Sequence, residues 1–317
     1  MNAFKRLLFY WQGLLAVGII LYYCMVALAA PLLAPQPFPD APSDFRMVKT
    51  EEINYPNPPA PDYPLGTFPS GGVRQTHVDV YFTLIWGARS AILFGLAATL
   101  ITGTFGALVG AISSFVGGTV GQVILRIADA FLAFPIIAGV VLFGQTIFPV
   151  YLFNYNPPTL FQQVLLGLGV DNVMLAIICF SWMPYTRIVH ADMERIRHAE
   201  FIVAAESIGA PPARIIFRHL IPNSLVNVIV LATRDIGGFV LLQATFSFLG
   251  LGGGSAWGEL LAMGRNWIMG EKGNPFHYWW VFLPVSLALV GVGIGWSLLG
   301  DFINDRANPR LRDFVPD

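Results

Sequence analysis

Two adjacent residues of opposite charge, Arg234 and Asp235, interrupt a long apolar stretch that follows Pro222. If that stretch lies in a bilayer, each charge costs about 2.5–3.5 kcal/mol on insertion scales, so both side chains face a bundle interior or water. One interpretation is that they line a polar pathway across the membrane. The alternative is a structural ion pair with a neighbouring span, for instance the span that carries Arg126 and Asp129.

A second group of candidate residues lies in the segment 187–222, the most charged part of the chain, where five arginines are nearly balanced by four acidic residues. The spacing of its apolar residues predicts a short helix over 200–209 and a second helix that ends or bends at Pro222. Gly209 suits the end of the first helix, and Pro211 or Pro212 suits the start of the second.

One face of the helix predicted over 200–209 is apolar, because Phe201, Ala204, Ala205 and Ile208 recur at spacings of three and four. The two helices therefore either rest on lipid headgroups as an interfacial element or form a rigid projection that docks into a groove of another protein. Small residues on this face allow close approach of a partner backbone, which favours docking.

The motifs of enzymes and metal sites are missing from the sequence. None of the three lysines follows a glycine, so there is no Gly-x-x-x-x-Gly-Lys-Ser/Thr loop for a nucleotide phosphate. Paired-cysteine and His-Glu-x-x-His spacings are also missing, and the two cysteines lie in apolar runs, which implies no disulfide framework. His190, His198 and His219 are irregularly spaced, which favours solvated surface over a metal site. We predict no catalytic residue, no cofactor and no metal.

The fractions of hydrophobic and charged residues indicate whether the chain lies in water or in a membrane. Of the 317 residues, 55% are hydrophobic and 12% are charged, and the formal net charge is −1. Soluble domains carry about 25% charged residues, so this chain is not an ordinary soluble globule. The same composition excludes a disordered chain and a nucleic-acid binder that relies on a basic face. We predict an integral membrane protein.

Charge-free stretches of about 20 apolar residues predict helices that span the bilayer. We expect six: about 8–30, 91–115, a third with Arg126 and Asp129 near its start and Pro135 inside it, 172–185, one after Pro222, and 278–300. The first is interpreted as an uncleaved anchor, since it is too long for a typical signal peptide. An even number places both termini on one side. That side carries ten Lys and Arg against six on the other, which favours the cytoplasm.

The spans divide the chain into four parts. We expect a cytoplasmic tail and first span over 1–34, a proline-rich extracytoplasmic segment over 35–89, a five-helix core over 90–300, and a cytoplasmic tail over 301–317. The proline-rich segment is expected to run extended over the outer surface. The segment 145–169, rich in aromatic residues, is expected at the membrane interface. The predicted fold class is all-α, with about six transmembrane helices.

The segment 187–222 resembles the Glu-Ala-Ala loop of bacterial ABC-transporter permeases. It has Ala204-Ala205, then three residues, then Gly209, and later Ile221-Pro222. The surrounding residues resemble the oligopeptide, dipeptide and nickel branch, and the second permease type of such systems is the best match. The resemblance covers about 64–311 and includes Trp86-Gly-Ala-Arg-Ser90, Ser247-Phe-Leu-Gly-Leu-Gly252, Trp257-Gly258, Leu299-Gly-Asp301 and Asn308-Pro-Arg310.

The sequence departs from the family pattern at the glutamate of the Glu-Ala-Ala triplet, which is Val203 here. This change puts in doubt an acidic contact to a partner at that position, though not the fold. The segment 68–74, which follows Leu65-Gly-Thr67, is also altered, and the loop after Gly252 is shorter than in relatives.

The resemblance implies a type I ABC importer permease fold in the bacterial inner membrane. The implied partners are a homologous permease, two ATP-binding cassette ATPases and an extracytoplasmic substrate-binding protein, and none is a nucleic acid. The helix over 200–209 is then the coupling helix, which sits in an ATPase groove so that ATPase closure moves the spans as rigid bodies. Its interface residues would be Glu200, Phe201, Ala204, Ala205, Gly209 and Arg214. The cargo would be peptides or related small solutes. If Arg234 and Asp235 line the pathway rather than form a structural ion pair, they would meet the charged ends of a peptide.

Two other classes of membrane protein make different demands on the sequence. A secondary transporter or channel driven by an ion gradient calls for inverted repeats and ionisable relays near the midplane. The sequence has no clear repeat, and only Arg234 and Asp235 qualify as a relay. A membrane-embedded enzyme needs a nucleophile–base or metal set, which the sequence does not offer. The ion-coupled transporter or channel stays as the alternative.

Overall fold

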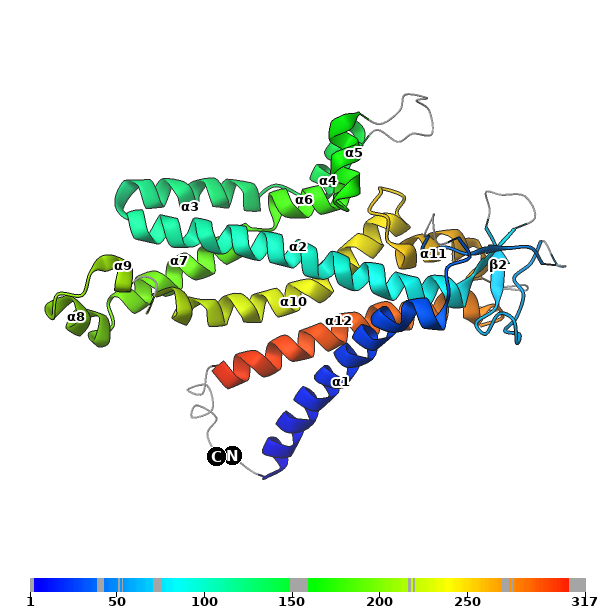
Figure 1. Ribbon diagram of the computed structural model, residues 1–317, viewed down its shortest axis with the longest axis horizontal. Helices are drawn as coiled ribbons and strands as arrows, with labels where there is room; N and C mark the ends of the chain where they lie inside the picture. The colour runs from blue at the N-terminus through cyan, green and yellow to red at the C-terminus, as the bar shows by residue number, and fades with distance from the viewer. Residues whose placement is uncertain are drawn as a thin grey trace.

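The computed structural model describes residues 3–38, 43–50, 52, 54–70, 76–148, 159–215, 218, 220–269, 274 and 276–307. These residues form a bundle of long helices with a small antiparallel sheet at one end (Figure 1). The helices are α1 (Ala3–Leu33), α2 (Val80–Val116), α3 (Gly118–Leu132), α4 (Ile136–Thr146), α5 (Leu160–Gly167), α6 (Asn172–Phe180), α7 (Met183–Arg197), α8 (Glu200–Ser207), α9 (Pro212–Ile215), α10 (Ile221–Phe248), α11 (Ala256–Gly264), a 3-10 turn η2 (Arg265–Trp267) and α12 (Trp279–Ala307).

Five helical stretches among the described residues are long and apolar enough to cross a membrane: Trp11–Leu33, Val80–Val116, Asn172–Arg197, Ile221–Phe248 and Trp279–Arg306. The helices α3 and α4 qualify together, although they are bent by 78° at the break between them. Counting this bent pair as one span gives the six that the sequence predicts. Figure 1 shows the start of α1 and the end of α12 toward the end that carries α8, opposite the sheet.

The helices α2 and α7 are longer than the sequence pattern predicts. Helix α2 begins at Val80 rather than near residue 91, because Asp79 caps it by accepting a hydrogen bond from the Phe82 backbone N–H. Helix α7 continues to Arg197, so the part of the predicted coupling loop over 187–197 is helical. Its charged residues find polar partners on neighbouring helices, which lets a charged sequence continue an apolar span.

Proline breaks the third predicted span instead of lying inside it. Helix α3 ends at Leu132, and Pro135 occupies the position before α4 with an extended backbone. The ring of a proline disfavours the helical conformation of the residue before it, so the break falls at this point. Pro184 lies in the first turn of α7, whereas Pro284 lies inside α12.

The proline-rich segment contains a sheet that an all-α prediction does not include. Strands β1 (Met47–Val48) and β2 (Thr67–Pro69) both pair antiparallel with β3 (His77–Asp79). The apolar residues Phe68 and Val78 of this sheet join Trp257 of α11 and Trp280 of α12 in one buried cluster. His77 is buried, and its Nδ1 lies 3.1 Å from the Thr67 hydroxyl. The segment is thus folded onto the helix ends rather than extended over them.

The segment 145–169 is described in part. Residues 149–158, which include most of its aromatic residues, lie outside the described part of the chain. After them α5 begins with a capping box, in which Thr159 and Gln162 satisfy each other's backbone N–H groups. Leu160 and Phe161 of this helix are largely exposed. The predicted place of this segment at the membrane interface stays a prediction.

Two carboxyl groups at the sheet end have raised pKa values. Burial raises the pKa of Glu259 on α11, and the charge of Asp44 raises it further. Burial also raises the pKa of Asp44, against the lowering effect of a hydrogen bond with Ser90. Neither carboxyl group lies in one of the membrane-crossing stretches.

We expect Glu259→Gln to raise the thermal stability of the purified protein near pH 8. An acid whose pKa is raised by folding binds more protons in the folded chain than in the unfolded chain between the ordinary and the raised pKa, so stability falls as pH rises through that window. Glutamine has no proton to lose and avoids this destabilisation. Thermal unfolding of both proteins at about pH 8 and about pH 4 tests this, because the advantage should vanish near and below the ordinary glutamate pKa. An equal difference at both pH values would contradict it.

Candidate functional site

The two short helices predicted in the segment 187–222 are present at the end of the molecule farthest from the sheet (Figure 1). Helix α8 ends just before Gly209, whose φ of 79° is a left-handed conformation that glycine adopts without a steric penalty. Pro212 is the first residue of α9, as predicted. This second helix is shorter than expected, since it ends at Ile215, and Pro222 lies in the first turn of α10.

Helix α8 is anchored to the bundle through one side. Ile202 is fully buried and belongs to an apolar cluster with Ile215 of α9 and with Met193 and Ile196 of α7. The side chains of Phe201, Ala204 and Ile208 are exposed; those of Phe201 and Ile208 are 51% and 86% exposed. The side chain of Ala205, predicted on the same face, lies outside what the structure describes. The result is a fixed helix with an exposed apolar face, which we call the α8 face (Phe201, Ala204 and Ile208).

Both charged residues predicted for the rim of the interface are exposed. Glu200 lies at the start of α8, next to Phe201, and Arg214 lies in α9. Val203, which stands where the family has glutamate, is 52% exposed on another side of α8. A side chain at this position is therefore accessible to a partner, but valine offers it no charge.

Helix α7, which leads into α8, lies directly against α2. A Cβ on Gly106 would overlap the Trp182 carbonyl oxygen, and one on Gly110 would lie 2.5 Å from the Thr186 carbonyl oxygen. The Thr186 hydroxyl donates a hydrogen bond of 2.9 Å to the Gly106 carbonyl. Backbone-to-backbone packing of this kind requires small residues in a membrane. The four-residue spacing of Gly106 and Gly110 was a signal for this contact that our sequence reasoning missed.

Polar contacts extend the α2–α7 interface toward α8. The Ser113 hydroxyl lies 2.7 Å from His190 Nδ1, and the Ser114 hydroxyl donates to Glu194 Oε1 over 3.0 Å. His190 is therefore half-buried against α2 and lies only in part on the solvated surface that we expected for it. Its spacing places it on the side of α7 that packs on α2.

Two side-chain hydrogen bonds join α7 to α10. The Tyr185 hydroxyl donates to Asp235 Oδ2 over 2.6 Å, and the Asn227 amide donates to Asp192 Oδ2 over 2.6 Å. Tyr185 is fully buried, whereas Asp235 is half-buried. Asp235 thus turns toward α7 and away from its sequence neighbour Arg234.

Arg234 pairs with Asp301 of α12, and Arg187 of α7 pairs with Asp129 of α3. The structural ion pair considered for Arg234 is therefore present, but its partner is not the Arg126–Asp129 pair. Asp301 follows directly on the charge-free stretch 278–300, so Arg234 lies level with the end of that stretch. At 1.5 Å per residue, about 20 Å of α10 precedes Arg234 on the α8 side. The guanidinium is therefore not in the middle of the apolar layer.

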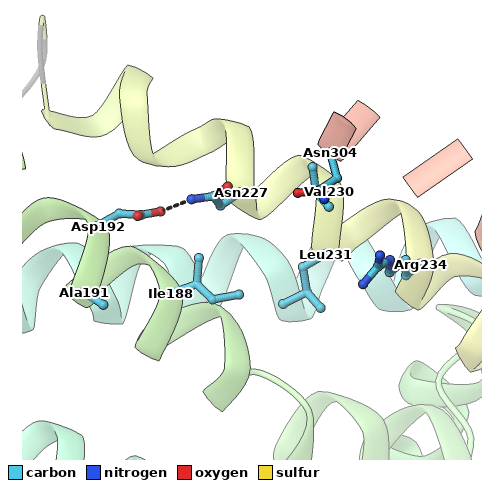
Figure 2. A pocket seen from close by; sticks show the side chains of 8 residues that line it. All are labelled: Ile188, Ala191, Asp192, Asn227, Val230, Leu231, Arg234 and Asn304. Carbon is cyan, nitrogen blue, oxygen red and sulfur yellow. Dashed lines mark hydrogen bonds between the residues drawn. The ribbon is translucent and has the colours of Figure 1, made fainter. Parts of the chain in front are cut away.

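A cavity of about 330 Å³ opens between α7, α10 and α12 near this ion pair. Figure 2 shows Ile188 and Leu231 reaching into it from facing helices, with the Asp192–Asn227 hydrogen bond at one side and Arg234 at the other. Asn304 of α12 also lines it. The cavity has apolar walls and a polar edge. It lies between α7 and α10, next to the Asp192–Asn227 hydrogen bond that joins them.

The chain is similar along most of its length to bacterial transport proteins. It is 26% identical over 297 residues to the oligopeptide transport system permease protein OppC of Bacillus subtilis, covering 93% of this chain and 84% of the relative. It is 28% identical to the dipeptide transport system permease protein DppC of Alkalihalophilus pseudofirmus, covering 98% and 90%. It is 29% identical to the nickel transport system permease protein NikC of Escherichia coli, covering 74% and 76%.

A family model matches residues 84–313, a region that runs from α2 past the end of α12 and contains the α8 face, the α2–α7 contact and the cavity. The helical architecture and the resemblance of the segment 187–222 agree with this match. The chain belongs to the family of binding-protein-dependent transport system inner membrane components, the permease subunits of ABC importers.

Proposed function

We propose that this permease forms, with a homologous permease, the translocation pathway for peptides or related small solutes, and that two separate ATPase subunits drive it through α8. The observation that carries this proposal is the α8 face, a largely exposed apolar surface on a helix that is fixed to the bundle by buried Ile202. A transport subunit without a nucleotide site of its own needs such a surface to receive work. The chain itself would be non-catalytic, with ATP hydrolysed by its partners.

The position of α8 favours a protein partner over lipid headgroups. Figure 1 shows α2 and α7 extending past the end of α12, and α8 lies beyond them. The charge-free stretch of α12 ends at Gly300, so α8 stands well outside the apolar layer. Interfacial helices instead lie in the plane of the headgroup boundary with their apolar face buried there. The contact surface we propose is the α8 face with Ala205 and Gly209, with Glu200 and Arg214 at its rim.

In the proposed orientation the protein crosses the bacterial inner membrane several times, and its α8 end lies in the cytoplasm. The charge bias of the sequence supports it, as does the position of the α1 start and the α12 end toward α8. The segment 35–89, with its sheet, then faces outward and meets a substrate-binding protein. The tail over 301–317 lies on the cytoplasmic side, and the core over 90–300 forms the permease proper.

The exposed side of α10 is the part of the bundle that we propose to line the pathway. Arg234, Gly238 and Thr245 are exposed along this helix at spacings of four and seven, and the Arg234 side chain is 49% exposed. The Arg234 guanidinium makes the α8 end of this stripe polar, which favours water or a partner helix over lipid there. Asp235 faces Tyr185 instead, so of the two candidate residues only Arg234 is proposed to meet cargo. The names of the relatives support peptides and nickel compounds as cargo classes.

Arg234→Gln should lower uptake of a peptide with a free carboxyl end about tenfold, the factor expected when a charge-assisted hydrogen bond is lost. Uptake of the same peptide with an amidated end should change little. Asp301→Asn is the matched control, since it breaks the same ion pair but keeps the guanidinium. If both variants reduce uptake of both peptides equally, the ion pair is structural and Arg234 does not meet the cargo.

Reconstitution tests the proposed function directly. The permease is assembled in liposomes with its partner permease, both ATPases and the binding protein, and uptake of labelled di- and oligopeptides and of a nickel chelate is measured. We expect uptake that needs ATP on the α8 side and that survives ionophores which collapse ion gradients. Uptake that persists without ATPase subunits and stops with an ionophore would instead support the ion-coupled transporter.

A further inference from the structure

We propose that transport moves α7, together with α2 and α8, against α10 and α12, and that the Tyr185–Asp235 hydrogen bond is the latch that holds the arrangement seen here. Tyr185 and Asp235 are thus positioning residues for the work delivered through α8. This inference rests on the proposed function, because it assumes that α8 receives force from an ATPase.

The first moving unit is built from α2, α7 and α8. The glycines of α2 bring its backbone against that of α7, so these helices cannot slide without a clash. The Ser113–His190 and Ser114–Glu194 contacts extend this fixed contact toward α8. Ile202 then ties α8 to α7. Force on α8 therefore reaches α2 and α7 as one body.

The second unit consists of α10 and α12, whose backbones also approach each other closely. A Cβ on Gly237 of α10 would lie 3.5 Å from both Gly293 Cα and the Val292 carbonyl oxygen of α12. The Arg234–Asp301 pair adds a charged link near the α8 end. These contacts leave little freedom between the two helices.

The two units meet differently at their two ends. Toward the sheet, a Cβ on Gly95 of α2 would lie 2.8 Å from the Ile236 carbonyl oxygen of α10, so the backbones are in contact. Toward α8, α7 has no glycine, its contacts with α10 run through side chains, and the cavity of about 330 Å³ opens between them. Helices packed through side chains can shear over small distances, whereas locked backbones cannot. The geometry therefore gives a pivot near Gly95 and a movable contact near the cavity.

The latch lies where the pivot and the cavity meet. The Tyr185 ring belongs to the first unit, since it is fully buried and packs against α2. A Cβ on Gly103 of α2 would lie 3.3 Å from Tyr185 Cε1. Its hydroxyl reaches Asp235 of the second unit over 2.6 Å. Any rotation of α7 away from α10 about the pivot must break or rebuild this bond, because its two partners belong to different units.

Removal of the latch should let the ATPases run without a signal from outside. In the reconstituted complex, Tyr185→Phe and Asp235→Leu should each raise ATP hydrolysis without binding protein about tenfold and abolish further stimulation by binding protein. Asp235→Asn keeps an acceptor and should behave like the original protein, which separates a hydrogen-bond latch from a need for charge. Tyr22→Phe removes a hydroxyl from an exposed ring and is the control. A basal rate of Tyr185→Phe at or below that of the original protein would overturn the latch.

Cross-linking tests the movement in assembled complexes, so that folding is not in question. Cys24 and Cys179 are first replaced by serine. The pair Ile188→Cys and Leu231→Cys is then joined across the cavity by a short reducible reagent. A second pair, Ser114→Cys and Glu194→Cys, is joined across the fixed α2–α7 contact. Only the first link should stop stimulated ATP hydrolysis, and reductant should restore it. Full activity with the first link closed would overturn the inference. In the unsubstituted complex, transport that needs no ATPase subunit would instead contradict the proposed function.

Discussion

Ala204→Arg should weaken binding of the ATPase subunit to the permease at least about a hundredfold. Ala204 lies in the centre of the α8 face, between Phe201 and Ile208, and a partner groove that accepts alanine has no room or counter-charge for a guanidinium. Leaving one charge buried and unpaired costs about 3–5 kcal/mol, which exceeds a hundredfold in affinity. Co-purification of the permease with the ATPase, and titration of solubilised permease with ATPase, measure the effect.

Val203→Arg is the matched control for this experiment. Val203 is also exposed on α8, but it lies about 100° around the helix from Ala204 and away from Phe201. The same charge at this position should leave binding within a fewfold of the original. Gly209→Trp provides a second probe, since it adds bulk and places a side chain at a left-handed φ. Unchanged assembly and unchanged stimulated ATP hydrolysis for both Ala204→Arg and Gly209→Trp would remove α8 as the docking element.

Local rules account for what the sequence predicted well. Gly209 and Pro212 mark the end of one helix and the start of the next because their backbone preferences act within a few residues. The apolar spacing of Phe201, Ala204 and Ile208 gives a shared face for the same reason. The six-span layout follows from the length of apolar runs, which a bilayer fixes. None of these features depends on distant parts of the chain.

The features that were missed depend on contacts across long distances in sequence. The partner of Arg234 is Asp301, which is 67 residues away, and no local pattern selects it over Asp129. The continuation of α7 to Arg197 depends on polar partners from α2 and α10. The sheet forms because Phe68 and Val78 find a cover in the helix ends. In each case the sequence shows the residue type, but it does not show which distant residue that side chain contacts.

The contact of α2 with α7 should be highly sensitive to an increase in side-chain volume. Alanine is normally a better helix former than glycine by up to about 1 kcal/mol, so Gly→Ala in an open helical position is neutral or stabilising. At Gly106 the added methyl group would overlap the Trp182 carbonyl oxygen and lie 2.7 Å from Tyr185 Cβ. Backbone atoms cannot move aside as a flexible side chain does, so α7 would have to shift as a whole.

Gly106→Ala should therefore destabilise the purified permease by about 1–3 kcal/mol, the usual cost of overpacking, despite the gain in helix propensity. Gly18→Ala in α1 is the matched control, since an added Cβ there meets nothing within 4 Å and should leave stability unchanged or slightly higher. Thermal unfolding of both variants in the same detergent compares them. Because α8 is carried by α7, the shift at Gly106 should also lower binding-protein-stimulated ATP hydrolysis in those complexes that still assemble. Equal stability of the two variants would mean that α2 and α7 are not locked, and force on α8 would then reach α7 alone.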